Sequence, residues 1–371
     1  MKFSAHSNEL QKALSRAASV LPTRSTHPAL ENLMFEVKGN MLNITATDMD
    51  ISMTCGVVVT GLADGSVLIP GKRIFDTVKS LTNQQVMFTI DVENKKIKMA
   101  TENGEYVLQG ESIDEFPKKP DFKGESEIEM SAETLRRIIG KTIFSVSTDE
   151  LRPAMMGVLF QLKESELCSV ATDGHRLVKM ITKGIKSPKD AKDIVIPAKA
   201  LNILSKLAED GGARMQVGAG HILFQNGQTT LISRLIEEPY PNYQSVIPAD
   251  NTKELMVSKD QMLASVRRVA LFSSLTTHQI RLSMTKSELT ITAEDIDFGS
   301  EAKETIACEY NGDEMEMGFN FGYVVDILTH IEGDEVIFKF SSATRAGIVV
   351  PRTQRDNENV LMLVMPVRLN G

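Results

Sequence analysis

The sequence predicts an α+β protein of 371 residues in which one domain, built from two helices and antiparallel β-sheets, is repeated three times. Three observations predict this fold class. A short strand followed by a helix, an acidic turn between two strands, and a strand leading straight into a second helix recur in the same order at nearly equal spacing. A chain of this length normally divides into several domains, and self-similarity at a fixed period indicates a repeat. We therefore expect three domains, at residues 1–125, 126–251 and 252–371.

The first helix of each repeat follows a short alternating segment and a serine. Alternation of apolar and polar residues is typical of a half-buried strand, and serine is a favoured N-cap residue. The serines are Ser4, Ser131 and Ser258, and the helices are expected at residues 9–20, 132–144 and 259–272.

An acidic turn is expected between two strands of every repeat, at Asp48, Asp173 and Asp295. In the middle repeat Gly174-His175-Arg176-Leu177 follows, so an acid, a histidine and a cation lie within four residues. This group suggests acid–base catalysis. However, no nucleophile motif accompanies it, and the aspartate recurs in all three repeats. We therefore expect no catalytic residue here, but a turn whose carboxylate accepts hydrogen bonds from the backbone.

The second helix of each repeat begins directly after a strand, with proline near its first turn in two repeats. Proline is tolerated there because the first N–H groups of a helix have no partner within it. These helices are expected at residues 70–81, 197–207 and 319–331, and each is followed by alternating strand pairs.

Positive charge is concentrated in the predicted helices, although the chain carries a net charge of -8. One interpretation is that surface helices commonly carry Lys and Arg. The other is that the helices face one polyanion, through phosphate contacts that carry no sequence information. No zinc-finger spacing or aromatic platform for reading bases is present, so this interpretation favours sequence-independent binding of duplex DNA. The candidate DNA-facing residues on the helices are Lys12, Arg16, Lys72, Arg73, Arg136, Arg137, Lys141, Lys199, Arg267 and Arg268.

The three cysteines, Cys55, Cys168 and Cys308, are widely spaced in apolar segments. Neither a disulfide framework nor a metal-ligand spacing is visible, so we expect buried reduced thiols and no metal or cofactor. The N-terminal residues do not have the pattern of a signal peptide and no apolar run is long enough to span a membrane, so we expect a cytoplasmic protein.

The repeat, Ala171-Thr172-Asp173-Gly174-His175-Arg176-Leu177 in the middle domain, and Val364-Met365-Pro366-Val367-Arg368-Leu369 at the C-terminus together resemble the β sliding clamp family, the β subunits of bacterial DNA polymerase III. The resemblance covers the whole chain. It implies a DNA clamp fold that forms a head-to-tail homodimer, a ring of six domains around duplex DNA. Such a protein is a non-catalytic processivity factor. A nucleic-acid-binding scaffold that does not encircle DNA remains the alternative.

The resemblance also implies partners and sites. Partners would be a second copy, duplex DNA, the replicative polymerase, the clamp loader and other clients that carry a clamp-binding motif. The dimer contact would involve Tyr106, Leu108, Leu271 and Phe272, unless the last two belong to the core of one chain. Arg24 would face DNA as well. The client-peptide pocket would be formed by Met155, Thr172, Gly174, His175, Arg176, Leu177, Pro241, Val246, Tyr323, Val364, Met365, Pro366 and Arg368.

Overall fold

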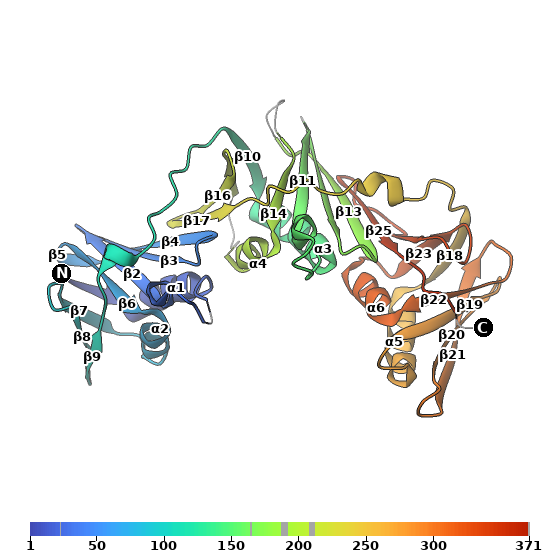
Figure 1. The fold of residues 1–371 in the computed structure, drawn as a ribbon, viewed down its shortest axis with the longest axis horizontal. Coiled ribbons are helices and arrows are strands. Elements are labelled where there is room, and N and C mark those ends of the chain that lie inside the picture. Colours follow the sequence, from blue (N-terminus) through green and yellow to red (C-terminus); the bar gives the residue numbers. More distant parts are fainter. Residues whose placement is uncertain (23, 164, 187–191, 208–211, 370–371) are drawn as a thin grey trace. The chain divides into compact units, whose positions relative to one another are not determined.

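The computed structural model describes residues 1–22, 24–163, 165–186, 192–207 and 212–369. The chain forms two compact units, Met1–Leu135 with Lys199–Leu235, and Arg136–Ala198 with Ile236–Gly371. Figure 1 shows the elements, coloured along the sequence. The element order repeats three times, as the sequence predicts.

The first repeat lies within the first unit. Its elements are β1 (Lys2–His6), α1 (Ser7–Ala18), β2 (Asn32–Lys38), β3 (Met41–Thr47), β4 (Ile51–Val58), β5 (Thr60–Ala63), β6 (Gly65–Pro70), α2 (Gly71–Lys79), β7 (Gln85–Asp91), β8 (Lys96–Ala100) and β9 (Glu105–Gln109). Helices α1 and α2 pack against each other, and α1 also packs on β3 and β4. The core includes Phe3 stacked on Phe88 at 4.7 Å between ring centroids, and both side chains are fully buried.

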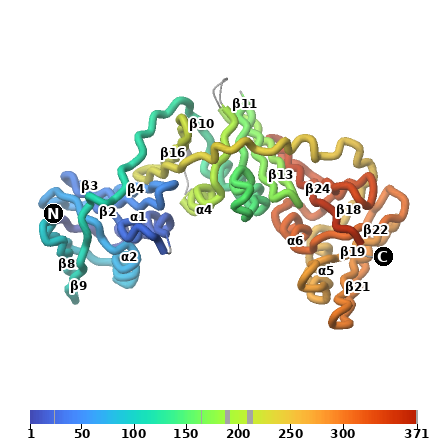
Figure 2. The backbone as a smooth tube through the Cα atoms, in the orientation of Figure 1, coloured from blue at the N-terminus to red at the C-terminus, as the bar shows by residue number. Residues whose placement is uncertain are grey.

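The second repeat contributes strands to both units. Its elements are β10 (Ser126–Ser131), α3 (Ala132–Thr142), β11 (Gly157–Lys163), β12 (Glu166–Thr172), β13 (Arg176–Lys183), β14 (Ile194–Pro197), α4 (Ala198–Leu207), β15 (Gly212–Val217), β16 (His221–Asn226) and β17 (Thr229–Arg234). A connector of residues 236–252 follows, and in Figure 2 its backbone crosses the strands of this repeat on the way to the third.

The third repeat lies within the second unit. Its elements are β18 (Lys253–Ser258), α5 (Lys259–Val269), β19 (Gln279–Met284), β20 (Glu288–Asp295), β21 (Ser300–Tyr310), β22 (Met315–Asn320), α6 (Phe321–His330), β23 (Glu335–Phe340), β24 (Gly347–Pro351) and β25 (Glu358–Val364). Helices α5 and α6 pack against each other, as α1 and α2 do.

Sheets run without interruption from one repeat into the next. The strand that follows the acidic turn pairs with the last strand of the following repeat, so β4 pairs with β17 and β13 pairs with β25, both antiparallel. The sheets of the described chain are β5-β1-β7-β8-β9, β10-β15-β16-β17-β4-β3-β2-β6, and β14-β11-β12-β13-β25-β24-β23-β18-β21-β20-β19-β22. Backbone hydrogen bonds therefore join the repeats at both junctions.

Helix starts differ in part from the prediction. Ser258 accepts a hydrogen bond from the Gln261 N–H at 3.5 Å, and Ser131 accepts one from the Thr134 N–H at 3.0 Å, as N-caps do. The prediction for Ser4 was wrong. Strand β1 continues to His6, because His6 still pairs with Gln85 of β7, and helix α1 begins only at Ser7.

Within the described residues, no helix combines the length and the hydrophobicity that a membrane-spanning segment requires.

Candidate functional site

The turn at Asp173 is held by its own side chains. The carboxylate Oδ1 of Asp173 accepts hydrogen bonds from the N–H groups of His175 and Arg176 at 2.8 and 2.9 Å. The hydroxyl of Thr172 donates to the Arg176 carbonyl at 2.7 Å and accepts from the Gly174 N–H at 3.1 Å. Gly174 has a φ of 91°, a conformation that glycine adopts without steric cost.

The same hydrogen bonds form in the first repeat. Asp48 accepts from the N–H groups of Asp50 and Ile51 at 3.1 and 2.7 Å, and Thr47 bonds the Ile51 carbonyl and the Met49 N–H. In the third repeat, Asp295 accepts hydrogen bonds from the N–H groups of Asp297 and Phe298, at 3.1 and 3.3 Å. The prediction of a structural turn is confirmed, because the carboxylates are occupied in the same way in each copy.

The side chain of Arg176 forms several hydrogen bonds and ring contacts. Its guanidinium donates to Asp173 at 3.0 Å, to the Phe144 carbonyl at 2.6 Å and to the Asp326 carboxylate. The same group lies over the rings of Tyr323 and Phe144, 4.9 and 5.4 Å from their centroids. Its side chain is only 11% exposed. Arg176 therefore ties β13 of the second repeat to helix α6 of the third.

A groove of about 450 Å³ opens beside this turn. It is mostly apolar and combines residues of the second repeat, the connector and the third repeat. Eight of the predicted pocket residues line it: Met155, Thr172, Gly174, Arg176, Leu177, Pro241, Val246 and Met365. The structure thus brings together residues that are far apart in the sequence.

Five predicted pocket residues do not line the groove: His175, Tyr323, Val364, Pro366 and Arg368. Val364 is fully buried, because it is the last residue of β25 and pairs with Arg176 and Gly347. His175 stacks on Tyr323 at 5.8 Å between centroids, beside the turn. For these five residues a role in client binding stays a prediction.

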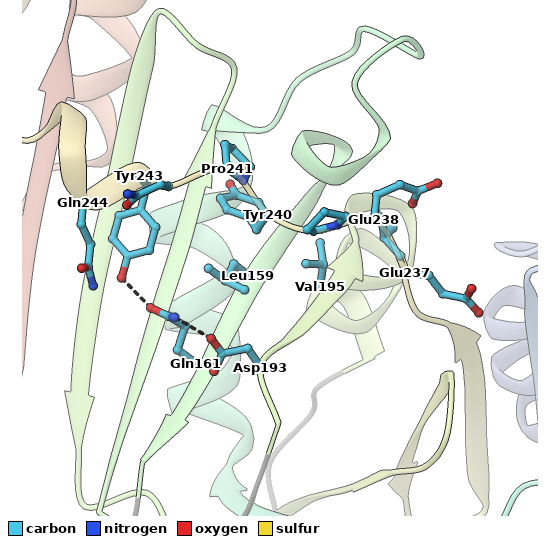
Figure 3. A pocket seen from close by; sticks show the side chains of 13 residues that line it. Leu159, Gln161, Asp193, Val195, Glu237, Glu238, Tyr240, Pro241, Tyr243 and Gln244 are labelled. Carbon is cyan, nitrogen blue, oxygen red and sulfur yellow. Dashed lines mark hydrogen bonds between the residues drawn. The ribbon is translucent and has the colours of Figure 1, made fainter.

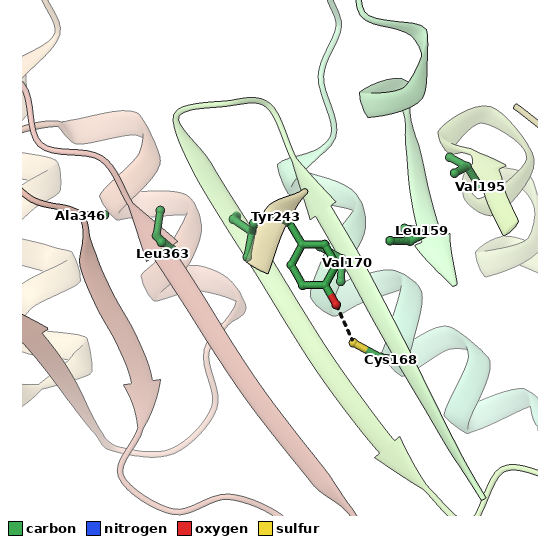
Figure 4. Packing of buried hydrophobic residues seen from close by; sticks show 8 residues of the cluster. Leu159, Cys168, Val170, Val195, Tyr243, Ala346 and Leu363 are labelled. Carbon is green, nitrogen blue, oxygen red and sulfur yellow. Dashed lines mark hydrogen bonds between the residues drawn. The ribbon is translucent and has the colours of Figure 1, made fainter. Parts of the chain in front are cut away.

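Sequence reasoning missed several lining residues of the groove: Asn242, Tyr243, Ser245, Pro248, Thr344, Arg345, Ala346 and Leu363. Tyr243, Ala346 and Leu363 belong to a buried cluster with Leu177 that forms the floor (Figure 4). The two prolines, Pro241 and Pro248, and the apolar pair Val246-Ile247 were the available signals for the connector. The sequence carries no signal that the turn between β23 and β24 lines the groove, because only the fold brings this turn there.

A second cavity of about 420 Å³, lined by both polar and apolar groups, shares Pro241, Asn242 and Tyr243 with the groove. Figure 3 shows Tyr243 donating to Gln161, which in turn donates to Asp193. Burial raises the pKa of the Tyr243 hydroxyl to about 12, so it stays a donor at neutral pH. The connector residues 241–243 therefore contribute to the lining of both cavities.

The predicted DNA-facing cations divide into two groups. Arg24, Lys72, Arg73, Arg136 and Arg267 are exposed and form no ion pair within the described chain. Others are paired: Lys12 with Glu9, Arg268 with Glu304 and Lys199 with Asp48. Arg16 donates to the Thr229 hydroxyl at 3.3 Å. Exposed pairs are weak and exchange readily, so Lys12 and Arg268 can still contact phosphate.

For Arg137 and Lys141 the prediction was wrong. Arg137 donates to Glu332 and Glu358 with two hydrogen bonds each, between 2.6 and 2.8 Å. Lys141 donates to the His330 carbonyl at 2.5 Å and pairs with Glu332 at 3.1 Å. Hydrogen bonds from Arg137 hold the pKa of Glu332 at about 2, well below its usual range. These cations join helix α3 to the third repeat rather than facing DNA.

The polar segment 351–359 covers this ion-pair network. Arg355 pairs with Glu332 at 3.4 Å. The side-chain amide of Gln354 donates to the Val360 carbonyl and accepts from its N–H, at 2.8 and 2.9 Å, as a neighbouring strand would. The segment therefore protects the start of β25 and encloses the pairs of Arg137.

The predicted dimer residues lie at surfaces of two different repeats. Leu271 is 82% exposed and Phe272 is exposed beside it, on the short turn after α5, so they are not core residues of this chain. Tyr106 is exposed on β9, at the edge of its sheet, whereas Leu108 is buried in its own domain. Val107, between them on the same strand, is exposed as well.

The thiols of Cys55, Cys168 and Cys308 are free, as predicted; the first two are buried and the third is half-buried. Burial raises the pKa of the Cys55 thiol to about 11, so it is unreactive at neutral pH. The described residues contain no group of three His, Cys, Asp or Glu side chains arranged to hold a metal ion.

Comparisons with known proteins agree over the full length. Models of the DNA polymerase III beta subunit match in order, with the N-terminal domain at residues 1–120, the central domain at 129–242 and the C-terminal domain at 244–368. The beta sliding clamp of Pseudomonas aeruginosa is 30% identical over 100% of both chains. A DnaN sliding clamp from Bartonella birtlesii bound to griselimycin has a TM-score of 0.95 at 26% identity, and the Bacillus subtilis DNA polymerase sliding clamp has 0.93 at 26%; each covers 100% of both chains.

Adjacent arginines allow a matched test of the ion-pair network. Arg137→Ala should lower the free energy of unfolding by about 3 kcal/mol, because it leaves the Glu358 carboxylate, 5% exposed, without its partner. Arg136→Ala, one residue away and exposed, should change it by less than about 0.5 kcal/mol. Chemical denaturation of both variants checks this. Equal stability of the two variants would show that the network contributes nothing.

Proposed function

The chain belongs to the DNA polymerase III beta subunit family and is a DNA sliding clamp, and we propose that it closes into a ring of six domains with a second copy. The observation that carries this proposal is the repeated junction. The strand after the acidic turn pairs with the last strand of the next repeat, first as β4 with β17 and again as β13 with β25. Applying the same junction a third time joins the third repeat to the first repeat of another copy.

Both strands needed for that third junction have a free edge. The strand after the third turn is β21, and over Ser300–Ala307 it pairs only with β20 among the described strands. The last strand of the first repeat is β9, which pairs only with β8 in the described chain. A contact made twice in a head-to-tail ring closes it, and leaves neither edge open to further copies.

Side chains around these edges support the same junction. Leu271 and Phe272 are exposed beside β21, and Tyr106 and Val107 are exposed on β9. The turn of the third repeat also exposes Ile296 and Phe298. The turns of the first two repeats contact the second helix of the following repeat, through Lys199–Asp48 and Arg176–Asp326. By the same rule, Ile296 and Phe298 would pack against helix α2 of the second copy.

DNA binding in this proposal depends on charge and topology rather than on sequence. Exposed cations on the helices, such as Lys72, Arg136 and Arg267, would contact phosphates without reading bases. Individual phosphate contacts are weak and salt-dependent, so they exchange as the protein moves along duplex DNA. The closed ring, not affinity, would keep the protein on its template.

The groove would bind peptide segments of the replicative polymerase, the clamp loader and other clients. Its apolar floor suits two or three apolar side chains, each contributing roughly 1.5–3 kcal/mol when buried. Ordering a flexible peptide opposes this by several kcal/mol, so single peptides would bind weakly and exchange. The chain itself would perform no chemistry and would act as a tether.

Removing the apolar side chains of the third junction tests ring closure. Leu271→Ala with Phe272→Ala should shift the protein toward monomer, because roughly 3 kcal/mol of apolar burial is lost at each of two interfaces. Light scattering after size exclusion measures this. Leu151→Ala, which truncates another exposed leucine, is the control. A double variant that stays dimeric at the same concentration as its parent would rule out this interface.

Encirclement predicts different retention on circular and linear DNA. Once loaded on a nicked circle by a clamp loader, the protein should remain through a wash with high salt and should leave when the circle is linearised. Gel filtration of the labelled protein with the DNA measures retention. Equal loss from both forms would contradict the ring and favour a scaffold that binds DNA without encircling it.

A charge in the groove should weaken client binding. Val246→Asp places a carboxylate against the apolar floor, which should weaken binding of a peptide from the polymerase at least about tenfold. Fluorescence anisotropy measures the affinity. Val92→Asp alters an exposed valine away from the groove and should bind the peptide normally. Unchanged affinity in Val246→Asp would place the client site elsewhere.

A further inference from the structure

The charged side chains that line the groove are all positive. Arg176 and Arg345 line it, and no acidic side chain does so among the described residues. An apolar site with a few charged groups gains its orientation and selectivity from those groups. Whether the groove favours an acidic peptide therefore depends on which of the two arginines is available to a ligand.

Arg176 is already held by partners within the protein. Asp173, Asp326 and the Phe144 carbonyl accept its hydrogen bonds, and two aromatic rings cover its faces. A peptide carboxylate would have to displace partly buried partners, and breaking such pairs is costly. Arg176 therefore shapes the wall of the groove, and its charge is already matched by Asp173 and Asp326.

Arg345, in contrast, is exposed and has one exposed ion-pair partner. Its side chain is 58% exposed and pairs with Asp250 at 2.5 Å. Asp250 is 62% exposed and lies outside the groove lining. Exposed ion pairs contribute little to stability and exchange with solvent readily. The guanidinium of Arg345 can therefore leave Asp250 for a carboxylate that arrives with a peptide.

The backbone below Arg345 is fixed. The side chain of Asn251 donates to the carbonyls of Ala346 and Lys339, both at 2.9 Å. Ala346 is buried in the same cluster as Leu177 and Leu363, the floor of the groove. The cation therefore stands at a defined place on the rim, directly beside the apolar floor.

We propose that Arg345 binds a carboxylate of the client, so that this groove selects peptides with an acidic group next to their apolar anchors. The inference rests on the proposed peptide groove and adds the class of ligand that the groove prefers. Arginine binds carboxylates through two parallel hydrogen bonds, which gives the contact geometric selectivity as well as attraction. The carboxylate belongs to an Asp or Glu side chain of the peptide.

A peptide library tests this selectivity. The probe is a set of heptapeptides with leucine at two central positions and random residues around them, made with amidated and with free C-termini. The wild-type protein should enrich peptides with Asp or Glu at one flanking position about fivefold over peptides with Asn or Gln at the same position. Preference for free over amidated C-termini would assign the site to a terminal carboxylate instead.

Variants at the rim provide the decisive comparison. Arg345→Glu should reverse the preference toward Lys and Arg, whereas Asp250→Asn should strengthen the acidic preference by freeing Arg345. Arg281→Glu is the matched control, because Arg281 also pairs with one exposed carboxylate but lies away from the groove. Its selected peptides should match those of the wild type.

Two failures are distinguishable. If wild type and Arg345→Glu both retain leucine peptides but with the same flanking residues, the selectivity proposal is wrong and the groove stands. If every peptide that the wild type retains is also retained by Val246→Asp, or if the wild type retains none, the groove is not a peptide site. The selectivity proposal then fails with it.

Discussion

The pairing of edge strands between repeats is the interaction on which the rest of the structure depends. At each junction within the chain, the strand that follows the acidic turn forms antiparallel backbone hydrogen bonds with the last strand of the next repeat. Backbone pairing places few demands on side chains, so the repeats can differ in sequence and still join in the same way. The groove exists because of one such junction, since its walls come from β13, the connector and the β23–β24 turn.

The sequence was sufficient for features set by local patterns. Order of elements, helix positions and the three turns could be predicted because strand alternation, capping serines and Asx turns act over a few residues. The prediction failed where one local signal was ambiguous. Ser4 resembles an N-cap, but pairing of β1 with β7 extends the strand past it.

Site residues were harder to predict because their roles depend on partners distant in sequence. Arg136 and Arg137 are neighbours of the same type, yet one is exposed and the other is only 14% exposed between Glu332 and Glu358. Successive residues on a helix point about 100° apart, so one face meets solvent and the other meets the third repeat. Nothing in the sequence near Arg137 indicates the carboxylates that lie about two hundred residues later.

The ion pairs at the two junctions have opposite polarity. At the first, the turn supplies the acid, Asp48, and the next helix supplies Lys199; at the second, the turn supplies Arg176 and the next helix supplies Asp326. A misfolded chain that docked α4 against the second turn would bring Lys199 toward Arg176, and like charges repel. The two junctions of this chain therefore differ in the sign of the charge that each partner supplies, so their partners are not interchangeable in charge.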